Sequence, residues 1–197
     1  MTEKWPVALD GVTETVVTTL GPNDRWNVAA LGVHAPENAD DADREPATAR
    51  TWGRTRTWRN FTERGSGYVQ FTRDPVDFVE AACSVREESV PILDSASAWA
   101  EVHVEQTASG EEDGTQWVDW QLFPEESEVV ERTVPTVSRA HAAVVEATVA
   151  ASRLGVSGYD DAALRERIDF FESVVERAGG EREREAWQRF ETLTSNP

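Results

Sequence analysis

The sequence is poor in residues that form disulfides and metal sites. Its 197 residues include one cysteine, Cys83, which excludes an intrachain disulfide and a thiolate metal cage. The histidines His34, His103 and His141 lie far apart and show none of the close spacings of zinc-binding sequences. We therefore expect no metal site, and we interpret Cys83 as a small buried apolar residue.

Long apolar runs and the motifs of several enzyme classes are also missing. No 18 successive apolar residues occur, and residues 1–11 lack a basic region followed by an apolar one. We therefore expect a cytoplasmic protein without a membrane partner. Gly65-Ser66-Gly67 lacks the third glycine of a dinucleotide fingerprint, which excludes a Rossmann site, and neither a P-loop nor a Gly-x-Ser-x-Gly pattern is present. The sequence identifies no catalytic residue.

Lysine is almost absent, and acidic residues greatly outnumber basic ones. Lys4 is the only lysine among 19 basic residues, which face 37 acidic residues and leave a formal net charge of -18. Such a composition is typical of proteins adapted to molar salt, where charge repulsion is screened beyond about 3 Å. We expect a halophilic archaeal cytoplasm as the setting; an ordinary acidic protein is the alternative. An acidic surface repels phosphate backbones, which excludes DNA and RNA as main partners.

One segment is basic against this acidic background. Residues 50–64 hold a single acid, Glu63, and five arginines, which are Arg50, Arg54, Arg56, Arg59 and Arg64. Thr55 and Thr57 add hydroxyl groups where a short helix is predicted to begin. A capped helix N-terminus offers free amides and a positive dipole end, which together with guanidinium groups form a phosphate site. We predict a phosphate site here. Arg50 and Arg64 lie at the ends of the segment, and we expect them to form surface ion pairs and not to bind the phosphate.

Alternating and valine-rich segments predict that the first two thirds of the chain are built mainly of β-strands. The predicted strands are residues 11–20, 25–35, 47–53, 68–71, 98–106 and 115–123, with one last strand at 128–134. The polar segment Pro36–Pro46 predicts an exposed loop, and Asp74-Pro75 predicts the start of a short helix that ends near Cys83.

From Thr136 the apolar period becomes helical. One predicted helix ends at Gly155, a second precedes Gly179-Gly180, and a third covers Glu181–Leu193. The chain is therefore predicted to be mainly β, with an all-α C-terminal subdomain.

Two stretches resemble a known family. Thr57-Trp58-Arg59-Asn60-Phe61, followed by Glu63, Gly65 and an aromatic-led strand, is similar to the D-T-x-R-N-I-x-E-T-G-E-F-V-V-N signature of flavin-reductase-like FMN-binding split barrels. Asn27-Val28-Ala29-Ala30 resembles the N-x-A-P stretch of the same families. Arg56 replaces the usual Asp, Ala30 replaces the Pro, and one extra residue lies at Ser66-Gly67. The likeness is strongest to an uncharacterised archaeal branch with a helical C-terminal region.

The resemblance implies an FMN-binding split β-barrel over residues 1–132 and a helical subdomain over residues 136–195. FMN would be the cofactor, and its phosphate and ring would be held by Asn27, Ala29, Arg54, Arg56, Thr57 and Asn60. The resemblance also implies a homodimer with FMN at its interface, and a nicotinamide or other electron donor for an FMN-dependent oxidoreductase. A flavin carrier or sensor, and a module for another phosphorylated metabolite, are the alternatives.

Two of the possible flavin contacts, Asn27 and the tryptophans Trp52 and Trp58, can also be explained without a ligand. Asn27 could meet the edge of a flavin, or it could be a turn asparagine that bonds to its own backbone. Trp52 and Trp58 flank the basic segment and could stack on a flavin, although most tryptophans serve cores or interfaces.

Overall fold

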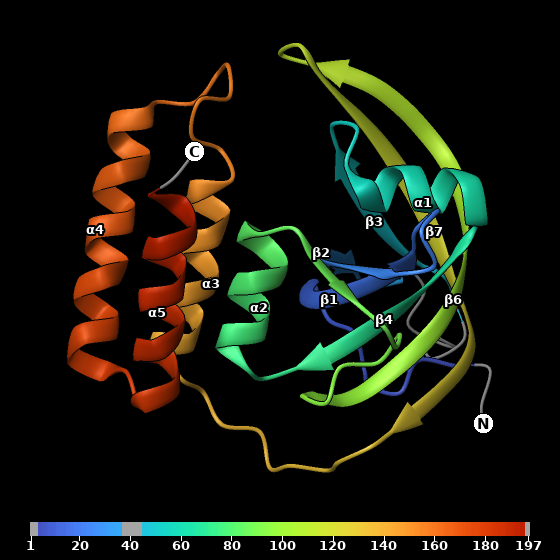
Figure 1. Ribbon diagram of the computed structural model, residues 1–197, viewed down its shortest axis with the longest axis horizontal. Helices are drawn as coiled ribbons and strands as arrows, with labels where there is room; N and C mark the ends of the chain where they lie inside the picture. Colours follow the sequence, from blue (N-terminus) through green and yellow to red (C-terminus); the bar gives the residue numbers. More distant parts are fainter. Residues whose placement is uncertain (1–3, 37–44, 196–197) are drawn as a thin grey trace. The chain divides into compact units, whose positions relative to one another are not determined.

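The chain divides into a β-rich unit and a helical unit in the computed structural model, which describes residues 4–36 and 45–195 (Figure 1). The β-rich unit contains the residues up to Arg73 and the segment Arg86–Arg132. The helical unit contains Asp74–Val85 and the residues from Thr133 onward. Most of the loop predicted at 36–46 lies outside the described residues.

Six antiparallel strands close the β-rich unit into a barrel, in the order β1-β4-β6-β7-β3-β2, with β2 pairing back onto β1. They are β1 (Val12–Leu20), β2 (Trp26–His34), β3 (Ala47–Trp52), β4 (Ser66–Thr72), β6 (Ala96–Glu112) and β7 (Thr115–Val129). A short strand, β5 (Arg86–Glu88), pairs with β2 and was not predicted. The predicted barrel followed by C-terminal helices is confirmed.

The β6–β7 hairpin is longer than the sequence pattern predicts and forms the long curved wall of the barrel in Figure 1. The separate strand predicted at 128–134 is wrong, because β7 continues unbroken to Val129. Its pairing ends where the amides of Val130 and Glu131 both donate to the Ser97 carbonyl, at 2.8 and 2.9 Å.

The short helix α1 (Arg56–Arg64) packs its inner face on the barrel core. Thr57, Asn60 and Phe61 are its buried residues, at the spacing that places side chains on one helical face. The Phe61 ring lies edge-on to Trp120 of β7, with centroids 5.3 Å apart. Gly65 ends the helix at φ 67°, a left-handed conformation that suits glycine, and its amide donates to the Phe61 carbonyl at 2.9 Å. The orientation of α1 is thus fixed by Phe61.

A fully buried glutamine, Gln70 of β4, fixes the segment that follows β5. Its Nε2 donates to Thr18 Oγ1 at 3.1 Å and to the Pro91 carbonyl at 2.9 Å. Its Oε1 accepts from the Leu93 amide at 2.7 Å. Buried polar groups are costly unless they are paired, so these bonds specify the path of residues 91–93 across β1 and β4.

Replacing Gln70 by leucine should lower the free energy of unfolding by about 2–3 kcal/mol, because the buried Leu93 amide would lose its acceptor. Thr18 Oγ1 would still donate to the Pro91 carbonyl, which limits the loss. Urea denaturation followed by tryptophan fluorescence measures the change. Gln106→Leu, at an exposed position of β6, is the control and should change stability by less than about 0.5 kcal/mol. Equal effects of the two substitutions would contradict the assigned role of Gln70.

Four helices form the second unit around an apolar core: α2 (Pro75–Cys83), α3 (Arg139–Ala151), α4 (Asp161–Ala178) and α5 (Glu181–Thr194). Asp74 caps α2 by accepting from the Val76 and Asp77 amides, and it also pairs with Arg182 of α5 at 2.7 Å. Burial acts to raise the pKa of Asp74, but these hydrogen bonds and Arg182 outweigh it and lower the pKa. Burial raises the pKa of the Cys83 thiol to about 11.

Candidate functional site

The N-terminus of α1 has the features of an anion site. Thr55 caps the helix, and its Oγ1 accepts from the Trp58 amide at 3.2 Å. The amides of Arg56 and Thr57 belong to the first turn, where no acceptor within the helix is available to them. This end of the helix also carries the positive pole of the helix dipole. Local sequence is sufficient to build this part of the site.

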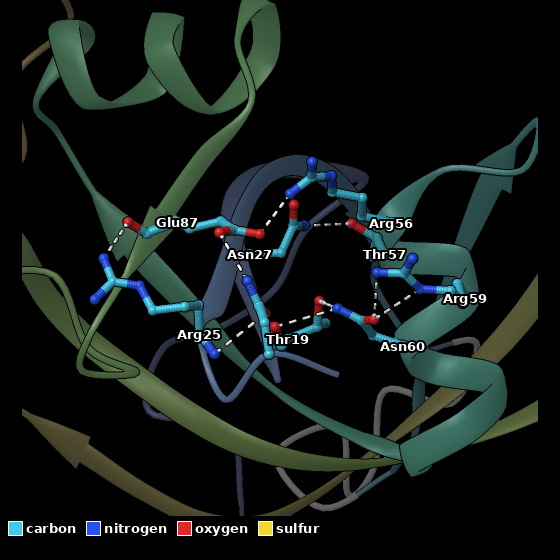
Figure 2. A network of polar contacts seen from close by, with 9 residues as sticks. Thr19, Arg25, Asn27, Arg56, Thr57, Arg59, Asn60 and Glu87 are labelled. Atoms are coloured by element: carbon cyan, nitrogen blue, oxygen red, sulfur yellow. Dashed lines mark hydrogen bonds and ion pairs between the residues drawn. The ribbon is translucent and has the colours of Figure 1, made fainter. Parts of the chain in front are cut away.

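Asn27 of β2 meets this first turn across 30 residues of sequence, as Figure 2 shows. Its Nδ2 donates to Thr57 Oγ1 at 3.4 Å, and both residues are buried, with exposed fractions of 6% and 5%. The hydroxyl hydrogen of Thr57 is left available for another acceptor. The side chain of Asn27 therefore faces α1, where it bonds Thr57 and not the backbone of its own turn.

Asn60 connects α1 to β1. It is fully buried, and its Nδ2 donates to the carbonyl and to the Oγ1 of Thr19, at 3.3 and 3.0 Å. Its Oδ1 accepts from the Arg59 guanidinium at 3.4 Å (Figure 2). Asn60 thus holds the helix in place and orients Arg59 beside the first turn.

A carboxylate on β5 lies against Arg56. Glu87 pairs in register with Asn27 on β2, and its Oε1 accepts from Arg56 Nη1 at 2.5 Å (Figure 2). Its Oε2 accepts from Asn23 Nδ2 at 3.1 Å, and its carbonyl accepts from Arg25 Nη2 at 3.1 Å. The sequence analysis missed Glu87, Asn23 and Arg25 as site residues. A three-residue strand is too short to show an alternating pattern, and the sequence of the turn at Asn23 does not indicate which residue it contacts.

The other predicted site residues lie further along the barrel. Ala29 faces the barrel interior, two residues beyond Asn27, and packs half-buried against the core. The Arg54 Nε donates to Gln116 Oε1 of β7 at 3.1 Å, beside an open hollow of about 400 Å³. The hollow is lined by Gly53, Arg54, Glu111, Gly114, Thr115 and Gln116. The structure therefore groups Asn27, Arg56, Thr57 and Asn60, and it directs Arg54 toward β7.

Arg50 forms the surface ion pair expected of it. Its guanidinium binds both carboxylate oxygens of Asp119, at 2.6 and 2.9 Å, and this contact raises the pKa of Arg50. The same guanidinium lies 5.5 Å from the ring centroid of Trp52 and 4.2 Å from that of Trp117. Trp52 remains 46% exposed. The contacts of Arg50 are thus with residues of the β3–β7 surface and not with the first turn of α1.

Three aromatic residues from β2, β4 and β6 form a row in which Tyr68 contacts the other two. Trp26 and Tyr68 have ring centroids 5.4 Å apart, and Tyr68 and Trp99 are 5.8 Å apart, both nearly edge-on. Burial, together with the charge and hydrogen bonding of Glu101, raises the pKa of Tyr68 to about 12. Tyr68 therefore stays protonated over the physiological pH range.

The donor set fits a phosphate monoester better than a metal ion. Arg56, Arg59, first-turn amides and the Thr57 hydroxyl all donate hydrogen bonds, as phosphate oxygens require. Within the described ranges, no group of three or more His, Cys, Asp or Glu side chains could hold a metal ion. Over those same residues, no helix combines the length and apolar character needed to cross a membrane.

The solved structures most similar to this chain include an FMN-bound protein from Methanosarcina mazei assigned to the DUF447 family. It is 22% identical, with a TM-score of 0.77, and the match covers 94% of this chain and 96% of that one. This likeness shows that the two chains share their fold.

Weaker matches include two bacterial proteins. Component B of nitrilotriacetate monooxygenase from Bacillus cereus has a TM-score of 0.46 at 16% identity, over 68% of this chain and 76% of that one. The flavin reductase of styrene monooxygenase from Pseudomonas putida S12 has a TM-score of 0.38 at 17% identity, over 62% and 82%.

Family comparison covers most of the sequence, whereas no curated protein matches it. Residues 13–131 match the family described as "Protein of unknown function (DUF447) N-terminal domain". Residues 138–192 match the accompanying "Protein of unknown function (DUF447)". The first match alone covers more than half of the chain, and it spans the barrel with its candidate site. The protein therefore belongs to the DUF447 family.

Proposed function

We propose that this protein binds FMN, with the phosphate at the N-terminus of α1. The observation that carries the proposal is the convergence of Arg56, Thr57 and Asn27 at one helix end. Support comes from the FMN-bound state of the Methanosarcina mazei protein, whose fold this chain shares. A phosphate monoester is also the ligand that suits free amides, a dipole end and guanidinium groups.

Each residue of the site has a distinct part in this proposal. Arg56, whose side chain is 43% exposed, donates to the phosphate through its guanidinium. Thr57 contributes its amide and hydroxyl, and Asn60 holds the helix and Arg59 in place. Asn27 and Ala29 share one face of β2 and lie along the path toward the flavin ring. Arg54 donates its Nε to Gln116 and would reach the ligand through its terminal guanidinium nitrogens.

The proposed binding unit is a homodimer with FMN at its interface. The N-terminus of α1 is open to solvent, because 43% of the Arg56 side chain is exposed. Ligand sites usually bury most of the ligand surface, and a second copy of this chain would supply the missing wall.

The activity that fits best is that of a flavin-dependent oxidoreductase. Bound FMN would supply electron transfer between a donor, such as a reduced nicotinamide, and an acceptor. The chain would bind, orient and shield the flavin. Anaerobic mixing of FMN-loaded protein with NADH or NADPH tests this: loss of the visible flavin absorbance indicates a reductase, and unchanged absorbance with both indicates a carrier or sensor. Purified protein that does not take up FMN would indicate a different phosphorylated ligand.

We expect FMN to bind much more tightly than riboflavin, which lacks the phosphate. Arg56→Ala should weaken FMN binding by about 1.5–3 kcal/mol, because a hydrogen bond to a charged group is lost. It should leave riboflavin binding unchanged. Flavin fluorescence titration measures both affinities. Arg64→Ala, which removes an arginine from the other end of α1, is the matched control and should have little effect. Equal affinities for the two flavins would refute the phosphate assignment.

A further inference from the structure

Arg56, the central phosphate ligand of the proposed function, already has an anionic partner within the chain. Glu87 approaches its guanidinium at 2.5 Å, and the Glu87 side chain is 29% exposed. A carboxylate and a phosphate monoester seek the same guanidinium hydrogens. The two anions repel each other at hydrogen-bonding distance, so both cannot bind the same edge of Arg56 without a cost.

The position of Glu87 is fixed by the strand that carries it. β5 pairs with β2, so Glu87 lies in register with Asn27, whose side chain bonds Thr57. Arg25 holds the Glu87 carbonyl, and Asn23 holds its second carboxylate oxygen. The carboxylate is therefore directed at the first turn of α1 by the pairing of β5 with β2 and by two hydrogen bonds from the turn before β2.

We infer that Glu87 is an affinity-determining residue of this site, because its carboxylate competes with the ligand phosphate for Arg56. The inference rests on the proposed phosphate site. Binding then exchanges one anion for another: Arg56 releases the carboxylate as it takes the phosphate, and Glu87 keeps its bond from Asn23. The carboxylate lowers the affinity for every phosphorylated ligand and leaves binding of uncharged groups unaffected.

The adjacent residue on the same strand provides a matched control. Glu88 has a side chain 33% exposed, against 29% for Glu87, and it accepts from Arg86 at 2.8 Å instead of from α1. Glu87→Gln and Glu88→Gln therefore remove the same charge from neighbouring positions of β5. Only the first removes the competitor for Arg56.

Flavin titrations in about 1 M KCl, where the Debye length is about 3 Å, isolate this direct contact from general charge repulsion. Glu87→Gln should bind FMN about three- to fivefold more tightly than the parent chain, the range expected for an exposed ion pair. Riboflavin affinity should not change, and Glu88→Gln should behave as the parent. Thermal melting confirms that each variant is folded.

A second measurement separates this inference from the assignment of FMN. The melting temperature of each variant is recorded in inorganic phosphate and in KCl of equal ionic strength. A larger phosphate-induced rise in Glu87→Gln than in the parent supports the competition, even if no variant binds FMN and the FMN proposal fails. Unchanged or weaker binding of both FMN and phosphate in Glu87→Gln overturns the inference. Equal tightening in Glu87→Gln and Glu88→Gln also overturns it, because the effect is then one of net charge.

Discussion

Saturating FMN is expected to lower the dissociation constant of the proposed homodimer by about ten-thousandfold. A ligand stabilises the state that binds it by about 2.7 kcal/mol at a hundredfold excess over Kd, and two interfacial sites double this to about 5.4 kcal/mol. That energy corresponds to about four factors of ten in an equilibrium constant. The exposure of Arg56 at the site is the reason to expect a weaker monomer site.

Analytical ultracentrifugation in molar KCl, at concentrations that populate the monomer, measures the dissociation constant with and without FMN. Arg56→Ala serves as the control, because a variant that binds FMN poorly should dimerise with little dependence on the flavin. A monomer that binds FMN as tightly as the dimer would place the whole site within one chain. Flavin fluorescence then reports binding while sedimentation stays unchanged.

The melting temperature should rise by about 10 °C or more between dilute buffer and about 2 M KCl. The formal net charge of -18 makes the folded chain repel itself, and salt reduces the Debye length from about 10 Å at 0.1 M to about 3 Å at 1 M. Relief of about 3 to 5 kcal/mol of repulsion accounts for such a shift in a chain of this size. Ion pairs such as Arg50–Asp119 will weaken in salt, but exposed pairs contribute little.

Differential scanning calorimetry at several KCl concentrations tests the salt dependence. Sucrose is the control, because an excluded neutral solute favours compact states without screening charge. A melting temperature that rises steeply with KCl concentration, and much more than with sucrose, supports adaptation to molar salt. A melting temperature that is flat in KCl would favour the alternative of an ordinary acidic protein.

Several features of the site could be predicted because they depend on residues close in sequence. Thr55 caps α1 and Gly65 ends it through contacts that span three or four positions. The acidic composition and the basic segment are likewise visible without a fold. The period-two pattern predicted β6 and β7 but not their full length, because the exposed ends of the hairpin, such as Glu111, bury too little to alternate.

The partners of these residues could not be predicted, because they depend on strand register. Asn27 and Thr57 lie 30 residues apart, and Arg56 and Glu87 lie 31 apart. A shift of one residue in the pairing of β5 with β2 would direct Glu87 to the opposite face. Nothing in three residues of sequence specifies that register.

A charged, β-rich chain followed by helices, with a capped, arginine-rich helix start, could be predicted from sequence alone, because capping, periodicity and net charge are local or additive properties. The folded structure was needed to show that Asn60 turns inward to Thr19, that Arg54 reaches Gln116, and that Glu87 bonds Arg56. The directions of Arg56 and Asn60 follow from the docking of Phe61 on the barrel core, and that docking depends on the closed sheet.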